Sequence, residues 1–318
     1  MNTLTSMILK RVGFGVITLL VISVLIFLGV EALPGDLAEA VLGQSATPET
    51  VEAFRKELKL DLPAHIRYFS WLGAFVKGDF GNSLSNGRPI ADQIGWRFSN
   101  SLFLAGITAA IAVPLAVILG MLAALYRNTL FDRVISISTL STISFPEFFV
   151  AYILIALLSV QVILFPSISN ITDNMPFIRK LHAIALPCLT LTMVVVAHMM
   201  RMTRAAIINV LTSPFIEMAR LKGLTRARII IHHAFPNALS PIINVVVLNL
   251  AYLVVGVVVV EVVFVYPGLG QLLVDAVSKR DLPVVQASGL IFATTYVFLN
   301  LTADVLAMLS NPKLRNPK

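Results

Sequence analysis

Long apolar runs constrain this chain more than any other feature of its sequence. A helix needs about 20 consecutive apolar residues to cross a bilayer, and lipid offers no partner to an unpaired backbone N–H or C=O group. We therefore predict an all-α membrane protein, with six transmembrane helices in a single domain covering residues 1–318. The predicted spans are Val12–Val30, Asn100–Leu125, Ile135–Leu157, His182–Met202, Leu239–Val262 and Val284–Leu309.

The composition agrees with this prediction. Only 13% of the residues are charged, compared with about 25% in a typical soluble domain. The first run follows Lys10 and Arg11 and could be mistaken for a signal peptide. It is longer than the apolar core of a signal peptide, and no A-x-A cleavage motif follows it. We therefore expect an uncleaved first helix.

The distribution of basic residues predicts an orientation. Short loops on the cytoplasmic side of a membrane are rich in Lys and Arg, which explains the formal net charge of +7 without a nucleic-acid partner. The opposite short loops carry only Arg179, Lys180, Lys279 and Arg280. We predict that both termini are cytoplasmic, that residues 31–99 form a periplasmic loop and that residues 204–238 form a cytoplasmic loop. The basic residues on the predicted cytoplasmic side are Lys10, Arg11, Arg127, Arg133, Arg201, Arg204, Arg220, Lys222, Arg226, Arg228, Lys313, Arg315 and Lys318.

The long periplasmic loop has helical patterning of its own. Thr47 and Pro48 form a helix start signal, and Val51, Phe54 and Leu58 then recur at helical spacing. A second amphipathic segment holds apolar residues at similar spacing and is closed by a glycine. Two short helices on the outer surface follow, which either contact an external partner or cover the first span. The apolar residues of the second segment are Ile66, Phe69, Leu72 and Phe75, with Gly78 after them.

The sequence holds no catalytic motif. It lacks the G-x-x-x-x-G-K-S/T loop that cradles ATP phosphates, and it lacks the G-x-S-x-G and H-E-x-x-H motifs. Cys188 is the single cysteine, and no Cys/His cluster has metal-ligand spacing. We therefore expect neither an enzyme nor a protein with its own cofactor or metal.

The cytoplasmic loop carries a short predicted helix. Ser213 and Pro214 start it and Gly223 stops it, which leaves about 13 Å of helix at 1.5 Å per residue. That length is too short to span a bilayer and fits a helix lying on the surface. Its apolar residues Phe215, Met218 and Ala219 either face a groove of a partner protein or belong to a plain connector, while Arg220 and Lys222 stay solvated.

This segment also carries a family resemblance. Glu217–Gly223, E-M-A-R-L-K-G, resembles the EAA loop of permeases from binding-protein-dependent ABC importers. Other segments resemble the dipeptide, oligopeptide and nickel branch of that family, so the similarity covers nearly the whole chain. They are ALPGD (Ala32–Asp36), LKLDLP followed by RYFSWLGAFVKGDFGNSL (Arg67–Leu84), EVVFVYPGLGQLLVDAVSKRDLPVVQ (Glu261–Gln286) and NLTADVLAML before NPKLR.

The resemblance implies a role, partners and a location. The chain would be the first of two homologous permease subunits in a bacterial inner membrane. It would import peptides or related solutes with two ATPase subunits, which bind ATP and magnesium, and a periplasmic substrate-binding protein. The short loop helix would be the coupling helix that docks into an ATPase. Its residues would be Phe215, Glu217, Met218, Ala219, Arg220, Lys222 and Gly223.

Some positions depart from the family pattern. Phe215 replaces a tyrosine, Glu217 an arginine and Leu221 an alanine, and the closing D-P-R motif reads Asn311-Pro312-Lys313. These changes bear on the fine specificity of ATPase docking and not on the family.

Three polar residues within the predicted spans are candidates for a translocation pathway. Glu147 lies in the third span directly after Pro146, where an ionisable group is costly and commonly faces a water-filled path. It would either attract a cationic group of the solute or stay protonated against carbonyls freed by the proline. Asn244 and Glu261, both in the fifth span, are the other candidates. The main alternative function is a self-sufficient secondary transporter or channel, but the paired broken helices of such proteins are not evident in the sequence.

Overall fold

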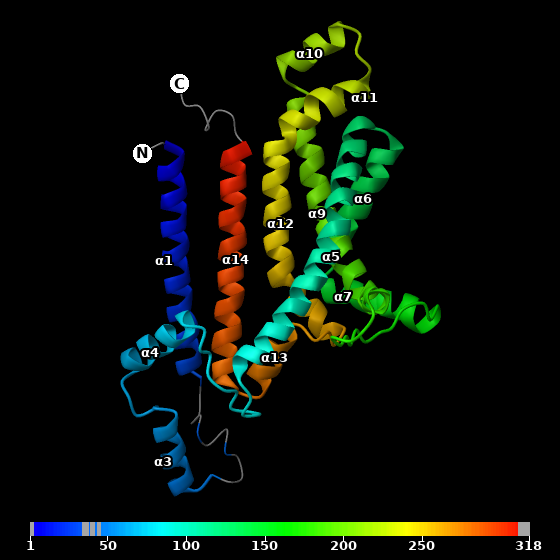
Figure 1. Ribbon diagram of the computed structural model, residues 1–318. Coiled ribbons are helices and arrows are strands. Elements are labelled where there is room, and N and C mark those ends of the chain that lie inside the picture. The colour runs from blue at the N-terminus through cyan, green and yellow to red at the C-terminus, as the bar shows by residue number, and fades with distance from the viewer. Residues whose placement is uncertain (1–2, 34–37, 39–41, 43–45, 311–318) are drawn as a thin grey trace.

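The computed structural model describes residues 3–33, 38, 42 and 46–310, and most of these form helices (Figure 1). The β pairing within the described residues is a single antiparallel bridge between Asn82 and Pro89. Most of the ALPGD segment, the NPKLR segment and the basic residues Lys313, Arg315 and Lys318 lie outside the described residues. The helices are α1 (Thr3–Glu31), α3 (Pro48–Glu57), α4 (Ala64–Val76), α5 (Ile90–Leu125), α6 (Leu130–Ser144), α7 (Glu147–Leu154), α8 (Phe177–Ala183), α9 (Ala185–Val210), α10 (Pro214–Leu221), α11 (Arg226–Arg228), α12 (Phe235–Val263), α13 (Leu269–Ser278) and α14 (Leu282–Ser310), with π-helical turns at Ile155–Gln161 and Ile229–Ala234.

Five helices in the described part are long and apolar enough to cross a membrane, and a sixth span exists if one bent pair is counted as one. They agree with the predicted spans, although α5 begins ten residues before Asn100, at Ile90. The predicted span Ile135–Leu157 is wrong as a single helix. It is divided between α6 and α7, which meet at 106°.

The break has a local cause in the sequence. A residue before proline is pushed out of the helical region, and Phe145 accordingly has ψ of 138°. Pro146 has no N–H to continue the α6 hydrogen-bond ladder, and it caps α7 instead, so that Glu147 is the first residue of the new helix. Pro146 therefore determines where the third span breaks and makes Glu147 the first residue of α7.

The long helices stand side by side, and the short helices cover their two ends (Figure 1). At one end lie α10 and α11, together with the start of α1 and the close of α14. At the other end lie α3, α4 and α13. The most buried long helix is α9, which packs on α5, α6 and α12, whereas α1 packs on α14 at the edge of the bundle.

The crossing of α5 and α9 depends on a small residue. A Cβ atom on Gly120 would lie 2.8 Å from Cβ of Thr203 and 2.9 Å from the carbonyl oxygen of Met200. Ala112, Ala116 and other alanines continue the same buried side of α5. Small residues let helix backbones approach closely in membranes, where van der Waals packing drives association.

A buried carboxylate fastens the segment before α5 to the bundle. Asp281, between α13 and α14, is almost fully buried. Its oxygens accept hydrogen bonds from the Ser83 hydroxyl at 2.5 Å, the Leu84 N–H at 3.1 Å and the Ser85 N–H at 3.2 Å. The segment before α5 is therefore fixed to the turn before α14, although almost 200 residues separate them in sequence.

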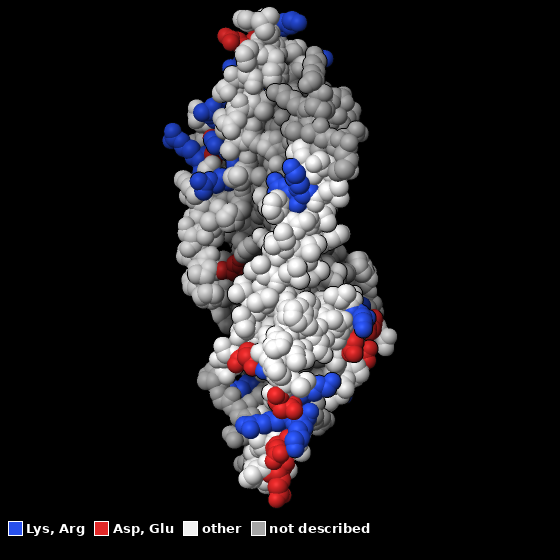
Figure 2. All heavy atoms as spheres, turned by 90° about the vertical axis from the view of Figure 1, so that its left-hand side faces the viewer, with Lys and Arg blue, Asp and Glu red and all other residues white. Residues whose placement is uncertain are grey.

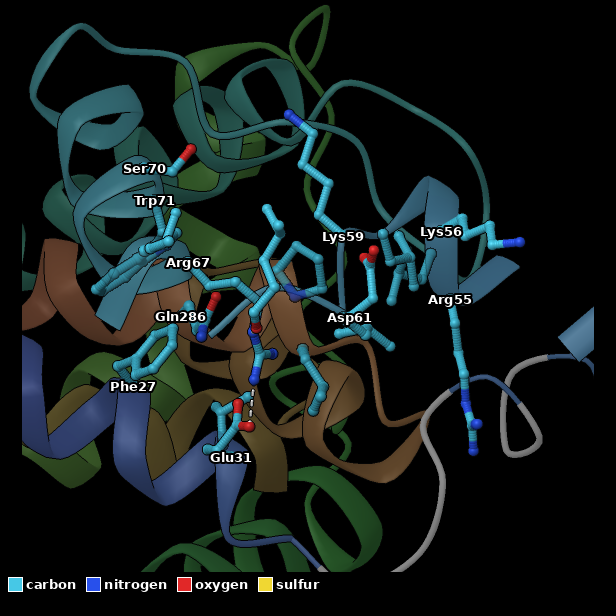
Figure 3. Close-up of a pocket in the computed structure, with 18 of the residues that line it drawn as sticks. Phe27, Glu31, Arg55, Lys56, Lys59, Asp61, Arg67, Ser70, Trp71 and Gln286 are labelled. Atoms are coloured by element: carbon cyan, nitrogen blue, oxygen red, sulfur yellow. Dashed lines mark hydrogen bonds and ion pairs between the residues drawn. The ribbon is translucent and has the colours of Figure 1, made fainter. Parts of the chain in front are cut away.

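The two predicted surface helices of the long loop are confirmed as α3 and α4. The second packs on the end of α1, where the hydroxyl groups of Ser23 and Tyr68 lie 2.8 Å apart. A cavity of about 1150 Å³ lies between α1, α3, α4 and the start of α14, and Arg67 and Glu31, which line it, form an ion pair (Figure 3). Figure 2 shows basic side chains at the α10 end of one face, charges of both signs at the α3 end, and a largely uncharged band between them.

Candidate functional site

The short helix α10 covers one end of the bundle. It begins at Pro214, as the sequence predicts, because proline needs no hydrogen-bond partner in the first turn. Ser213 precedes it in an extended conformation, and its carbonyl group accepts a hydrogen bond from the Ile216 N–H at 3.0 Å. The helix is eight residues long, so it lies on the surface and spans nothing.

Gly223 ends α10 in the way that the sequence predicts. Its φ is +76°, which is the left-handed region that glycine adopts without steric cost. The Gly223 N–H donates to the Arg220 carbonyl at 2.9 Å, and the Leu224 N–H donates to the Ala219 carbonyl at 3.3 Å. These two bonds form a Schellman motif. A Cβ atom on Gly223 would have no neighbour within 4 Å, so a side chain there meets backbone strain and no clash.

The outward face of α10 is apolar. Phe215, Met218 and Leu221 have exposed fractions of 45%, 56% and 77%, and they follow one another at the three-residue spacing of a helical face. Glu217, Arg220 and Lys222 are exposed as well. Leu221 was absent from the predicted docking set, although this spacing from Phe215 and Met218 could have identified it. A short helix with three exposed apolar side chains is suited to a groove in a partner.

The inward face of α10 fixes the helix to its own chain. Ile216 is fully buried and Ala219 nearly so, in a cluster with Ile207 of α9 and with Ile229 and Ile230 of the π-helical turn. The prediction that Ala219 faces a partner's groove is therefore wrong, because Ala219 packs inside this subunit. Ile216 is the anchor that the sequence analysis missed. Through this cluster α10 packs against α9 and α12.

An ion pair joins α6 to α9 in the same half of the molecule. The Arg204 guanidinium donates two hydrogen bonds of 2.8 Å to the two carboxylate oxygens of Asp132. This bidentate geometry is the strong form of an Arg–carboxylate pair. It ties α6 to α9, and Ile207 of α9 belongs to the cluster beneath α10.

Glu261 lies in a buried network of hydrogen bonds at the start of α13. Its carboxylate is fully buried and accepts hydrogen bonds from the N–H groups of Gly270 at 2.7 Å and Gln271 at 3.1 Å. The Ser101 hydroxyl donates to it at 2.5 Å and accepts from the Leu269 N–H at 2.8 Å. The first three N–H groups of α13 are thereby satisfied, as a helix N-terminus requires. In this arrangement Glu261 holds the start of α13 and is not among the residues lining the two cavities described for this chain, so its pathway role stays a prediction.

Glu147 and Asn244 reach accessible surfaces of the chain. Glu147 is half-buried and lines a second cavity at the break between α6 and α7, where its carboxylate accepts a hydrogen bond from the hydroxyl of Tyr252. Asn244 is exposed on α12 and is not among the residues lining that cavity, so its pathway role stays a prediction. Tyr252 is a residue that no sequence pattern singled out.

The described residues form a bundle of membrane-length helices with a short helix of exposed apolar side chains at one end, as in a multi-pass membrane protein. The chain matches the family described as binding-protein-dependent transport system inner membrane component over residues 116–316. It also matches the N-terminal part of such membrane components over residues 4–117. The chain therefore belongs to this family, and it is a multi-pass inner-membrane permease of an ABC importer and not an enzyme.

Individual relatives resemble the chain along almost its whole length. The glutathione transport system permease protein GsiC of Escherichia coli is 38% identical over 308 residues, which cover 97% of this chain and 98% of the relative. The proteins of the same name from Shigella dysenteriae and Shigella boydii are 38% and 37% identical with the same coverage.

Proposed function

We propose that this permease moves peptides or related small solutes, including glutathione, from the periplasm to the cytoplasm. The solute class follows from the relatives named for glutathione transport and from the resemblance to peptide permeases. A self-sufficient secondary transporter or channel is not favoured, because the family depends on a binding protein.

ATP is hydrolysed by separate partner subunits in this proposal. The sequence has no phosphate-binding loop, so energy enters the permease by contact with another protein. Two ATPase subunits would bind ATP and magnesium, a homologous second permease would complete the pathway, and a periplasmic binding protein would deliver the solute. The α10 end would face the cytoplasm, with both chain termini on that side.

The exposed apolar face of α10 carries this proposal. Phe215, Met218 and Leu221 point away from the bundle at the end that is rich in basic residues, and Ile216 ties the helix to α9 and α12. A partner bound to α10 would therefore move α9 and α12 when it changes conformation. Glu217, Arg220 and Lys222 surround the apolar face and would contribute contacts at its rim, where exposed pairs add about 1 kcal/mol or less.

A pair of substitutions at Gly223 tests the coupling role. Valine strains the left-handed conformation, in which an ordinary side chain costs about 1–2 kcal/mol, whereas asparagine tolerates it better. We expect Gly223→Val to abolish the ATPase stimulation caused by the loaded binding protein in the reconstituted importer, and Gly223→Asn to retain most of it. Wild-type stimulation in Gly223→Val would show that α10 is not the coupling element.

A further inference from the structure

Glu147, His198 and Tyr252, from three different helices, line the cavity at the break between α6 and α7. Glu147 begins α7, His198 lies near the middle of α9, and Tyr252 lies on α12. The cavity has a volume of about 390 Å³. Ionisable groups at this level of a membrane bundle are costly and commonly mark a solute path or a partner. The other lining residues are Thr142, Ile143, Phe145, Pro146, Phe148, Val194, Gly256 and Val259.

The contact between Tyr252 and Glu147 depends on Gly256, which leaves space for the tyrosine ring. Gly256 follows Tyr252 by one helical turn, and a Cβ atom on Gly256 would lie 3.0 Å from Cζ of the tyrosine ring. The absence of a side chain therefore lets the ring lie along α12 while its hydroxyl donates to the Glu147 carboxylate. The Tyr252 hydroxyl holds the Glu147 carboxylate on one side. The Glu147 side chain is half-buried and also lines the cavity.

The walls around Glu147 are aromatic. Phe145, Phe148 and Tyr252 line the cavity, and each remains exposed in the isolated chain, by 49%, 49% and 41%. Phe145 stacks on Phe149 with ring centroids 5.3 Å apart, which holds the wall in place. A carboxylate among aromatic faces recognises an organic cation, because the carboxylate accepts charge-assisted hydrogen bonds and the ring faces attract positive charge.

We propose that this cavity binds the protonated amine of the solute in transit, with Glu147 as the specificity-determining carboxylate. The inference rests on the proposed peptide-transport function and adds the chemical group that the permease itself recognises. The Tyr252 hydroxyl satisfies the carboxylate when no amine is bound, and the ammonium group replaces it when a solute enters. Glu147 thus has a hydrogen-bond donor both in the empty cavity and when a solute is bound. This donor lowers the free-energy cost of placing a carboxylate within the membrane.

The test compares two forms of one peptide in the complete importer, with its binding protein and ATPases, in proteoliposomes. One form has a free N-terminal amine and the other is N-acetylated. For each variant we divide the ATP-dependent uptake rate of the free peptide by that of the acetylated peptide and compare this ratio with the wild-type ratio. A preference of the binding protein for one form affects both ratios equally and therefore cancels. We expect Glu147→Gln to lower the free-to-acetylated ratio by about tenfold or more, the scale of one hydrogen bond to a charged group.

Two further variants serve as controls. Glu52→Gln removes the same charge from an exposed position on α3 and should leave the ratio at its wild-type value. Tyr252→Phe removes the competing hydroxyl but keeps the aromatic wall, and should retain the preference for the free amine. Size-exclusion chromatography of each complex checks that the variants assemble.

The possible failures are distinguishable. If Glu147→Gln lowers the uptake of both peptides equally, or leaves the ratio unchanged, the amine site is overturned and the peptide function stands. If the wild-type importer takes up neither peptide in an ATP-dependent manner, the peptide function fails and the amine site fails with it.

Discussion

The hydroxyl of Ser101 on α5 donates a hydrogen bond of 2.5 Å to the carboxylate of Glu261 on α12. Because Glu261 also accepts hydrogen bonds from two N–H groups at the start of α13, this one carboxylate joins α5, α12 and α13. Gly268 and Gly270 allow the approach, since a Cβ atom on Gly270 would lie 2.7 Å from Cα of Val258 and one on Gly268 would collide with Glu261 itself. The two glycines of the Y-P-G-L-G segment (Tyr266–Gly270) therefore let its backbone pack directly against the Glu261 side chain.

Replacing Glu261 should destabilise the folded subunit. Glu261→Ala leaves three buried donors without an acceptor, at a cost on the order of 3 kcal/mol, and should lower the Tm of the purified permease in detergent by several degrees. Glu261→Gln keeps one accepting oxygen and should cost about 1 kcal/mol. Equal Tm values for the two variants and wild type would show that the carboxylate does not hold α13.

A second prediction concerns the crossing of α5 and α9. Gly120→Val inserts a branched side chain where a Cβ atom already meets Thr203 at 2.8 Å, and overpacking of this kind costs about 1–3 kcal/mol. We expect a lower Tm for the isolated subunit. Gly106→Ala on the same helix is the control, because a Cβ atom there has no neighbour within 4 Å and alanine favours helix. A stability loss in Gly106→Ala equal to that in Gly120→Val would contradict the close crossing.

The helices of this fold are predictable from sequence because each depends on local signals. Apolar runs identify the long helices, and Pro214 and Gly223 mark the two ends of α10 correctly. The division of the third span at Pro146 was not predicted, because a proline near the middle of an apolar run is compatible with a kink as well as with a full break. The angle of 106° depends on packing against α9 and α12, which local sequence does not encode.

The candidate site was predictable only where its residues are neighbours in sequence. The outward face of α10 follows from spacing, but the burial of Ile216 and Ala219 depends on packing against the π-helical turn at Ile229–Ala234. Similarly, Glu147 is conspicuous as a charge in an apolar run, whereas Tyr252 lies 105 positions away. The hydrogen bonds of Glu261 were not predicted, because the helix terminus that it satisfies belongs to a later segment.

A third prediction tests the orientation. Lys56 on α3 and Lys222 after α10 are both exposed and lie at opposite ends of the molecule. A cysteine at position 56 should react with a membrane-impermeant thiol reagent added to the periplasmic side, and a cysteine at position 222 should react only after the membrane is permeabilised. The native Cys188 is buried and should give little background. Labelling of position 222 alone in intact cells would reverse the proposed topology.

The last prediction separates the two faces of α10. Leu221→Ser changes an outward side chain, so the Tm of the isolated permease should stay within about 1 °C of wild type, because exposed substitutions change stability by about 0.5 kcal/mol or less. In the assembled importer, however, ATPase stimulation by the loaded binding protein should fall severalfold. Ile216→Ala deletes a buried side chain, at a cost of about 2–5 kcal/mol, so the Tm itself should fall. If Leu221→Ser lowers the Tm as much as Ile216→Ala while stimulation per folded complex is normal, the outward face serves folding and does not dock an ATPase.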